Sequence, residues 1–226
     1  MPFRGFPDDT FTFYERLAAD NSRSFWQANK ALYTSAVREP LDELLADLDE
    51  YGPYHVFRPY KDVRFSKDKI PYKDHQGAYG ESQGGAGFYV QVSASGLMAA
   101  TGYYAMASDQ LARFREAVDA DAVGAEIAAI VAELGRQGYT VGAIGELKTA
   151  PRGYPRDHAR IELLRRKGLM VSRLWAPAKW MHTKAVVQRI RDAWEGAAAM
   201  NEWLDLHVGP STIAPDEDEI ARFGPF

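Results

Sequence analysis

The side chains best suited to chemistry concentrate in one cationic stretch, Arg58–Lys73, which holds six lysines and arginines and two aspartates. Its net charge of +4 lies within a chain of 226 residues whose formal net charge is −4. Guanidinium groups match the planar geometry of phosphate and carboxylate oxygens, and lysine adds a mobile point charge. The stretch therefore predicts a binding site for an anionic ligand.

A second cationic stretch, Lys148–Arg173, holds eight lysines and arginines and two acids, a net charge of +6. The two stretches together carry +10, so the other residues sum to −14. This segregation favours two basic segments that converge on one anion. The alternative is a lattice of surface ion pairs with the acids elsewhere, each pair worth about 0–1 kcal/mol.

We expect side chains from both stretches to bind the ligand: Arg58, Lys61, Arg64, Ser66, Lys67, Lys69, Tyr72, Lys73, Arg152 and Arg156. If a reaction occurs, Asp62, Asp68 and His158 are the candidates for acid–base catalysis. His158 and Glu162 have i, i+4 spacing, but two ligands without a third do not predict a metal site. A plain hydrogen bond between them is the simpler expectation. The sequence identifies no cofactor.

Other motifs exclude several kinds of site. The glycine-rich stretch Gly77–Gly87 lacks the Gly-Lys-Ser/Thr ending of a phosphate-binding loop and precedes a strand, so we interpret it as a flexible connection. Cysteine is absent, which excludes thiolate nucleophiles, disulfides and cysteine-ligated metals.

The elements that must position these residues follow from hydrophobic periodicity. Three helices are expected in the first fifty residues, with apolar faces at Phe11, Tyr14, Leu17 and Ala18, at Phe25, Ala28, Leu32 and Ala36, and at Leu41, Leu44, Leu45 and Leu48. Strands are expected at 54–57, 63–65, 88–93, 97–104, 139–141 and 171–175. Later helices are expected to begin at Ser108 and at Asp121 and to cover 155–167, and one long helix is expected from Trp180. This order predicts an α+β fold, a mostly antiparallel sheet flanked by helices.

The overall composition bounds the class of protein. Apolar residues make up 46% and charged residues 26%, which is typical of a globular domain. We expect a single domain over residues 1–210 and an acidic tail over 211–226. The chain shows no signal peptide and no run of 18 apolar residues, so we expect a cytoplasmic protein that does not cross a membrane.

The chain resembles a family of bacterial and fungal proteins known as domain of unknown function 2461. The first basic stretch resembles the family's hallmark at Asp62, Arg64, Phe65, Ser66, Lys67, Asp68, Lys69, Pro71, Tyr72 and Lys73. Residues of the opening helices, among them Asn21, Trp26 and Tyr33, and a later block from Leu147 to Lys167 extend the resemblance to 3–206. The resemblance implies no established activity.

Three classes of function remain open from the sequence. The leading interpretation is a protein that binds a small phosphorylated or carboxylated ligand in a basic cleft, and the sequence leaves open whether it turns the ligand over. A nucleic-acid-binding module could use the same cations, although a sequence pI near 5.8 counts against it. A protein that docks an acidic partner through its basic segments is the third class. The oligomeric state is not predicted.

Overall fold

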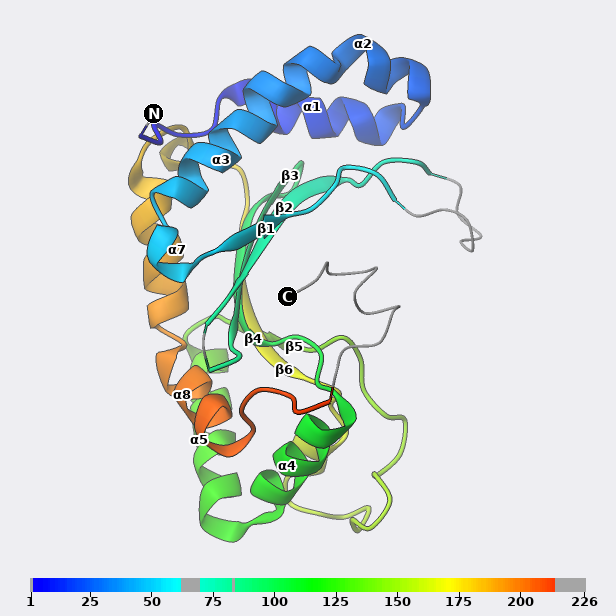
Figure 1. Cartoon of the computed structure of the whole chain (residues 1–226), viewed down its shortest axis with the longest axis vertical. Coiled ribbons are helices and arrows are strands. Elements are labelled where there is room, and N and C mark those ends of the chain that lie inside the picture. Colours follow the sequence, from blue (N-terminus) through cyan, green and yellow to red (C-terminus); the bar gives the residue numbers. More distant parts are fainter. Residues whose placement is uncertain (1, 62–69, 83, 214–226) are drawn as a thin grey trace. The chain divides into compact units, whose positions relative to one another are not determined.

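The computed structural model describes residues 2–61, 70–82 and 84–213 (Figure 1). Its α-helices are α1 (Asp8–Ala19), α2 (Arg23–Tyr33), α3 (Glu39–Ala46), α4 (Ser108–Asp119), α5 (Asp121–Arg136), α6 (Ile161–Leu164), α7 (Ala185–Glu195) and α8 (Ala198–His207). Its strands are β1 (Tyr54–Val56), β2 (His75–Glu81), β3 (Gly87–Ser93), β4 (Gly96–Tyr103), β5 (Thr140–Gly142) and β6 (Leu169–Trp175). A π-helical turn, Thr34–Arg38, joins α2 to α3, and 3-10 turns cover Asp49–Tyr51 and Lys179–His182.

The strands form an antiparallel sheet in the order β1-β2-β3-β4-β6-β5, which confirms the predicted α+β class. At one edge, Tyr54 of β1 lies opposite Gly80 of β2. At the other edge, Thr140 of β5 lies opposite Ser172 of β6. None of the helices in the described part of the chain combines the length and the apolar character that crossing a membrane requires.

The chain divides into two compact units, each with its own core. Unit 1 comprises Met1–Glu81, Phe88–Ala99 and Leu174–Trp194. Unit 2 comprises Ser82–Gly87, Ala100–Arg173 and Glu195–Phe226. That residues 1–210 form a single domain stays a prediction.

In unit 1, the three predicted N-terminal helices are present. Ser22 caps α2 by accepting a hydrogen bond from the amide of Phe25, as the position of a serine before an apolar stripe indicates. All four leucines of the predicted α3 stripe are buried. The predicted α2 stripe was right in part: Ala36 is buried, and Phe25 and Leu32 pack against the core. Ala28 is exposed, and the residues that α2 itself buries are Trp26 and Tyr33.

The glycine-rich stretch was wrongly predicted as a flexible connection throughout, since Gly77 and Gly80 lie within strand β2. A Cβ atom at position 77 would lie 2.5 Å from the hydroxyl oxygen of Tyr89, and one at position 80 would overlap the carbonyl oxygen of Tyr51. These glycines therefore permit close packing within a strand.

In unit 2, the helices α4, α5 and α8 contact one another. Their buried faces enclose a second core that includes Phe114, Ile127 and Leu204.

The long helix predicted from Trp180 is instead a 3-10 turn followed by α7 and α8. Gly196 lies between the two helices, where the poor helix propensity of glycine favours a break.

Candidate functional site

The described ends of the first basic stretch pair with each other. The amide of Lys61 donates to the carbonyl of Pro71 at 2.9 Å, and the amide of Lys73 donates to the carbonyl of Pro59 at 2.8 Å. Tyr60 lies opposite Tyr72 in the same antiparallel pairing. Both prolines lack an amide hydrogen and serve as acceptors. We call residues 57–61 and 70–74 the basic ladder. Its two segments run side by side beyond β1 and β2 (Figure 1).

An aromatic and amide clamp fixes the basic ladder to the α1–α2 hairpin. The Asn21 side chain donates to the carbonyl of Tyr72 and accepts from its amide, both at 3.1 Å. The ring of Tyr72 stacks on Trp26 with centroids 4.4 Å apart and planes at 10°. Because Trp26 and Tyr72 are both buried, the ladder has a rigid support.

The basic ladder places the cation Arg58 near Lys73. The Lys73 ammonium lies 4.9 Å from the centroid of the Phe57 ring. Burial lowers the pKa of Lys73, and the nearby Arg58 lowers it further. The carboxylate of Asp74 instead pairs with Nδ1 of His75 at 2.8 Å. Within the described ranges, no carboxylate forms an ion pair with Arg58, Lys61 or Lys73.

The central part of the predicted site lies outside the described residues. It comprises Asp62, Arg64, Ser66, Lys67, Asp68 and Lys69, together with the strand expected at 63–65. Of the predicted residues that are described, Tyr72 has its ring in the core, and burial raises the pKa of its hydroxyl. The ring of Tyr72 thus supports the ladder, and a contact of its hydroxyl with a ligand stays a prediction.

The helix predicted over residues 155–167 was wrong, since only Ile161–Leu164 is α-helical there. The amide of Arg160 donates to Nδ1 of His158 at 2.9 Å instead of forming a helical hydrogen bond. The Arg160 guanidinium donates to the carbonyl of Val118 at 2.6 Å, which fixes this turn to the end of α4. The tertiary contacts of one arginine thus override the helical pattern.

His158 has a partner at each ring nitrogen. Nε2 lies 3.1 Å from a carboxylate oxygen of Asp119, and Nδ1 accepts the amide of Arg160. The expected hydrogen bond to Glu162 was wrong, since the described partner is Asp119 and Glu162 pairs with Arg165. A catalytic role for His158 stays a prediction.

The remaining predicted ligands, Arg152 and Arg156, are exposed in the loop that precedes α6. This loop belongs to unit 2, whereas the basic ladder belongs to unit 1. The convergence of the two basic stretches on one ligand stays a prediction. The described residues contain no group of three histidine, aspartate or glutamate side chains placed to hold a metal ion.

Comparison with known proteins assigns the chain to a family. The family model of conserved hypothetical proteins DUF2461 matches residues 9–203, which include the basic ladder, its clamp and the loop before α6. The chain belongs to the DUF2461 family. No curated protein and no solved structure matches it significantly.

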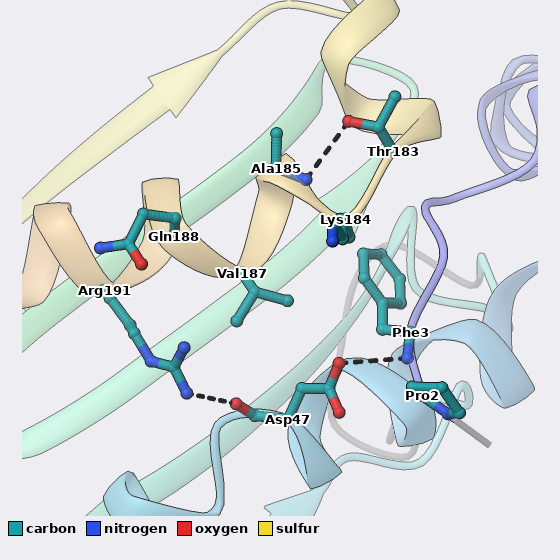
Figure 2. Close-up of a pocket in the computed structure, with 9 residues that line it drawn as sticks. All are labelled: Pro2, Phe3, Asp47, Thr183, Lys184, Ala185, Val187, Gln188 and Arg191. Carbon is teal, nitrogen blue, oxygen red and sulfur yellow. Dashed lines mark hydrogen bonds between the residues drawn. The ribbon is translucent and has the colours of Figure 1, made fainter.

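A shallow groove of about 770 Å³ also lies within unit 1 of this DUF2461 member (Figure 2). Two of its charged side chains are already paired: Arg191 donates to Glu50 and to the carbonyl of Asp47, and the Asp47 carboxylate accepts the amide of Phe3. The hydrogen bond from Arg191 lowers the pKa of Glu50. These contacts join the N-terminal segment, the end of α3 and α7. We therefore interpret the groove as a packing junction between these elements, without a role in ligand binding.

Sequence reasoning did not identify the clamp residues Asn21 and Trp26, or Phe57 of the basic ladder, as parts of a site. Asn21 is 51 positions from Tyr72, and no local spacing connects the two residues. The only sequence signal was the resemblance to the family's opening helices, which includes Asn21 and Trp26. Phe57 looked like an ordinary strand residue, although its ring lies beneath the Lys73 ammonium.

Proposed function

We propose that the basic ladder, with the segment that it closes, binds a small phosphorylated or carboxylated ligand. The supporting observation is the proximity of Arg58 and Lys73: burial lowers the pKa of Lys73, and Arg58 lowers it further. Two positive charges this close repel each other, and an anion bound between them would offset the repulsion. Since the described residues offer these two cations no carboxylate, a ligand is the natural counter-charge.

The support beneath the ladder favours binding of a ligand in a fixed position. Asn21 holds both backbone groups of Tyr72, and Trp26 stacks on its ring. A site whose supporting side chains are already packed loses little conformational freedom when a ligand binds. In this proposal, the cations Arg64, Lys67 and Lys69 contact the same ligand, and Arg152 and Arg156 approach from the second stretch.

The proposal predicts the effect of removing one exposed cation, Arg58. Arg58→Gln should weaken the binding of pyrophosphate or citrate by about tenfold, because each anion loses a charge-assisted hydrogen bond. Isothermal titration calorimetry measures this change. Arg4→Gln removes another exposed arginine of unit 1 and should leave the affinity unchanged.

The pKa of Lys73, measured by NMR, provides a second readout. Bound anion should raise it, because a nearby negative charge favours the ammonium form. Arg58→Gln should also raise it in the free protein, since Arg58 lowers it there. An unchanged Lys73 pKa at saturating pyrophosphate and citrate would contradict the proposed site.

Salt dependence separates the small ligand from nucleic acid. Contacts with several backbone phosphates would make the affinity for a single-stranded oligonucleotide fall steeply as salt rises. We expect pyrophosphate or citrate to bind with a shallower slope. Tight oligonucleotide binding with a steep slope, and no binding of either small anion, would favour the nucleic-acid-binding class instead.

A further inference from the structure

A second cavity, of about 250 Å³, lies wholly within unit 2, between α5 and the turn that contains α6. Ala128, Val131 and Ala132 of α5 form one wall, and Leu163 of α6 contributes to the other. The small side chains of α5 leave this space open. Since pockets for drug-sized ligands measure about 300–1,000 Å³, the volume suits a short ligand with an apolar body. We call this cavity the α5 groove.

One arginine that lines the α5 groove, Arg166, lacks a protein acceptor. Its Nε atom is enclosed and has no hydrogen-bond partner. In the ranges that the structure describes, its side chain forms no ion pair and no other hydrogen bond. A guanidinium next to an apolar wall is unfavourable without an acceptor, because it has lost part of its hydration.

The neighbouring arginines are fully engaged, which sets Arg166 apart. Arg160 donates to the carbonyls of Val118 and Asp119 at 2.6 and 2.8 Å. Arg165 donates to the carbonyl of Leu147 at 2.7 Å and pairs with the carboxylates of Glu162 and Glu146. Among the described residues, Glu162 is the one carboxylate that lines the groove, and it is already matched.

We propose that the α5 groove binds a small monocarboxylate with a short apolar chain. The guanidinium of Arg166 would hold the carboxylate in a planar, paired geometry. The chain would lie against Val131 and Leu163, where contact with water is removed. One unmatched guanidinium suits one negative charge, whereas a phosphate dianion would place a second charge near Glu162.

This site is independent of the basic ladder. None of its residues belongs to the ligand set proposed for unit 1, and the groove lies in the other unit. Either proposal can therefore fail without the other.

The test is an NMR titration of the labelled protein with hexanoate. Saturable amide shifts are expected in residues 128–132 and 159–166. Hexylammonium, with the same chain and the opposite charge, should cause none, and acetate should bind at least about tenfold more weakly because it buries little apolar surface. No saturable shift with hexanoate, or equal shifts with hexylammonium, would overturn the proposal.

Variants locate the site. Arg166→Gln should weaken hexanoate binding by at least about tenfold, since it removes the charge-assisted pair. Ala132→Leu should weaken it as strongly by filling the groove, whereas Ala129→Leu should not. Ala132 and Ala129 are both exposed on α5, but only Ala132 lines the groove. If Arg166→Gln fails to fold, equal binding to the two leucine variants still overturns the proposal.

Discussion

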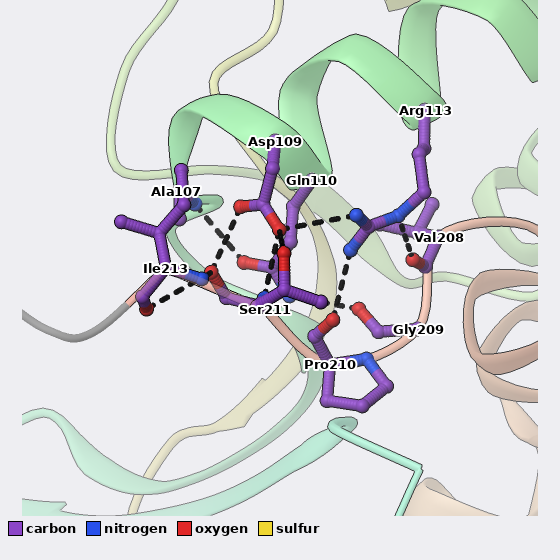
Figure 3. A network of polar contacts seen from close by, with 10 residues as sticks. Ala107, Asp109, Gln110, Arg113, Val208, Gly209, Pro210, Ser211 and Ile213 are labelled. Carbon is purple, nitrogen blue, oxygen red and sulfur yellow. Dashed lines mark hydrogen bonds and ion pairs between the residues drawn. The ribbon is translucent and has the colours of Figure 1, made fainter.

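Asp109, the second residue of α4, binds the last described residues of the chain (Figure 3). Its carboxylate accepts hydrogen bonds from the amide of Thr212 at 2.8 Å and from the hydroxyl of Ser211 at 2.8 Å. Arg113 pairs with it at 3.0 Å and also donates to the carbonyl of Pro210. These hydrogen bonds, the Thr212 amide first, hold the pKa of Asp109 well below its usual range.

The lowered pKa of Asp109 predicts how the C-terminal segment responds to pH. A carboxyl whose folded pKa is depressed stabilises the fold above its unfolded pKa of 3.8, and this contribution is lost as the pH falls through the lower folded value. Asp109→Asn should remove the contribution at neutral pH. We expect the Thr212 amide to exchange with solvent about tenfold faster in this variant, as measured by hydrogen exchange.

A matched control separates the Asp109 contact from a general charge effect. Glu126→Gln removes one exposed carboxylate from α5 in the same unit and should leave Thr212 exchange unchanged. Equal exchange in the wild-type protein and Asp109→Asn would show that the network does not hold the segment.

At the scale of the elements, two glycines of unit 2 should respond oppositely to alanine. Gly102 in β4 has φ of +123°, and a Cβ there would lie 2.5 Å from the carbonyl oxygen of Leu169. Gly102→Ala should therefore lower the free energy of unfolding by at least about 1–3 kcal/mol. Gly135 in α5 has nothing within 4 Å of such a Cβ, so Gly135→Ala should raise it by about 0.5–1 kcal/mol.

Urea denaturation of both glycine variants measures these changes directly. Since both substitutions add one methyl group, their difference reports the local backbone and packing. A Gly102→Ala variant as stable as the wild-type protein would contradict the close approach of β4 and β6 at this residue.

The helices and strands that the sequence predicted correctly are those with a strong local pattern. The α3 leucine stripe and the alternation in β3 each reflect one face packed on a core. The pattern failed where side chains bind distant backbone. Arg160 reaches the carbonyl of Val118, 42 positions away, and this contact prevents the helix that residues 155–160 would otherwise favour.

Only the positive charge of the candidate site could be predicted from the sequence. The density of cations in the first stretch is visible in the sequence, and the structure describes Arg58, Lys61 and Lys73 of that set. The support for those cations was not predictable, because Asn21 meets Tyr72 through a hydrogen bond between residues far apart in the chain. Arg166 likewise looked like any other basic residue until its neighbours proved to be paired.

At the scale of the whole molecule, the chain passes between its two units five times, since each unit is made of three segments. Strands β4 and β6 each contribute residues to both units. Unfolding of one unit must therefore release strand residues that continue into the other. This continuity favours unfolding as one cooperative step, and the single domain expected from the sequence stays a prediction.

Core truncations in each unit test this cooperativity. Leu44 in unit 1 and Ile127 in unit 2 are fully buried in separate cores, and replacing either by alanine should lower the free energy of unfolding by about 2–5 kcal/mol. Because the units share strands, each variant should shift the same single transition in differential scanning calorimetry. Two transitions, with Leu44→Ala moving only one and Ile127→Ala only the other, would show that the units are separate domains despite their shared strands.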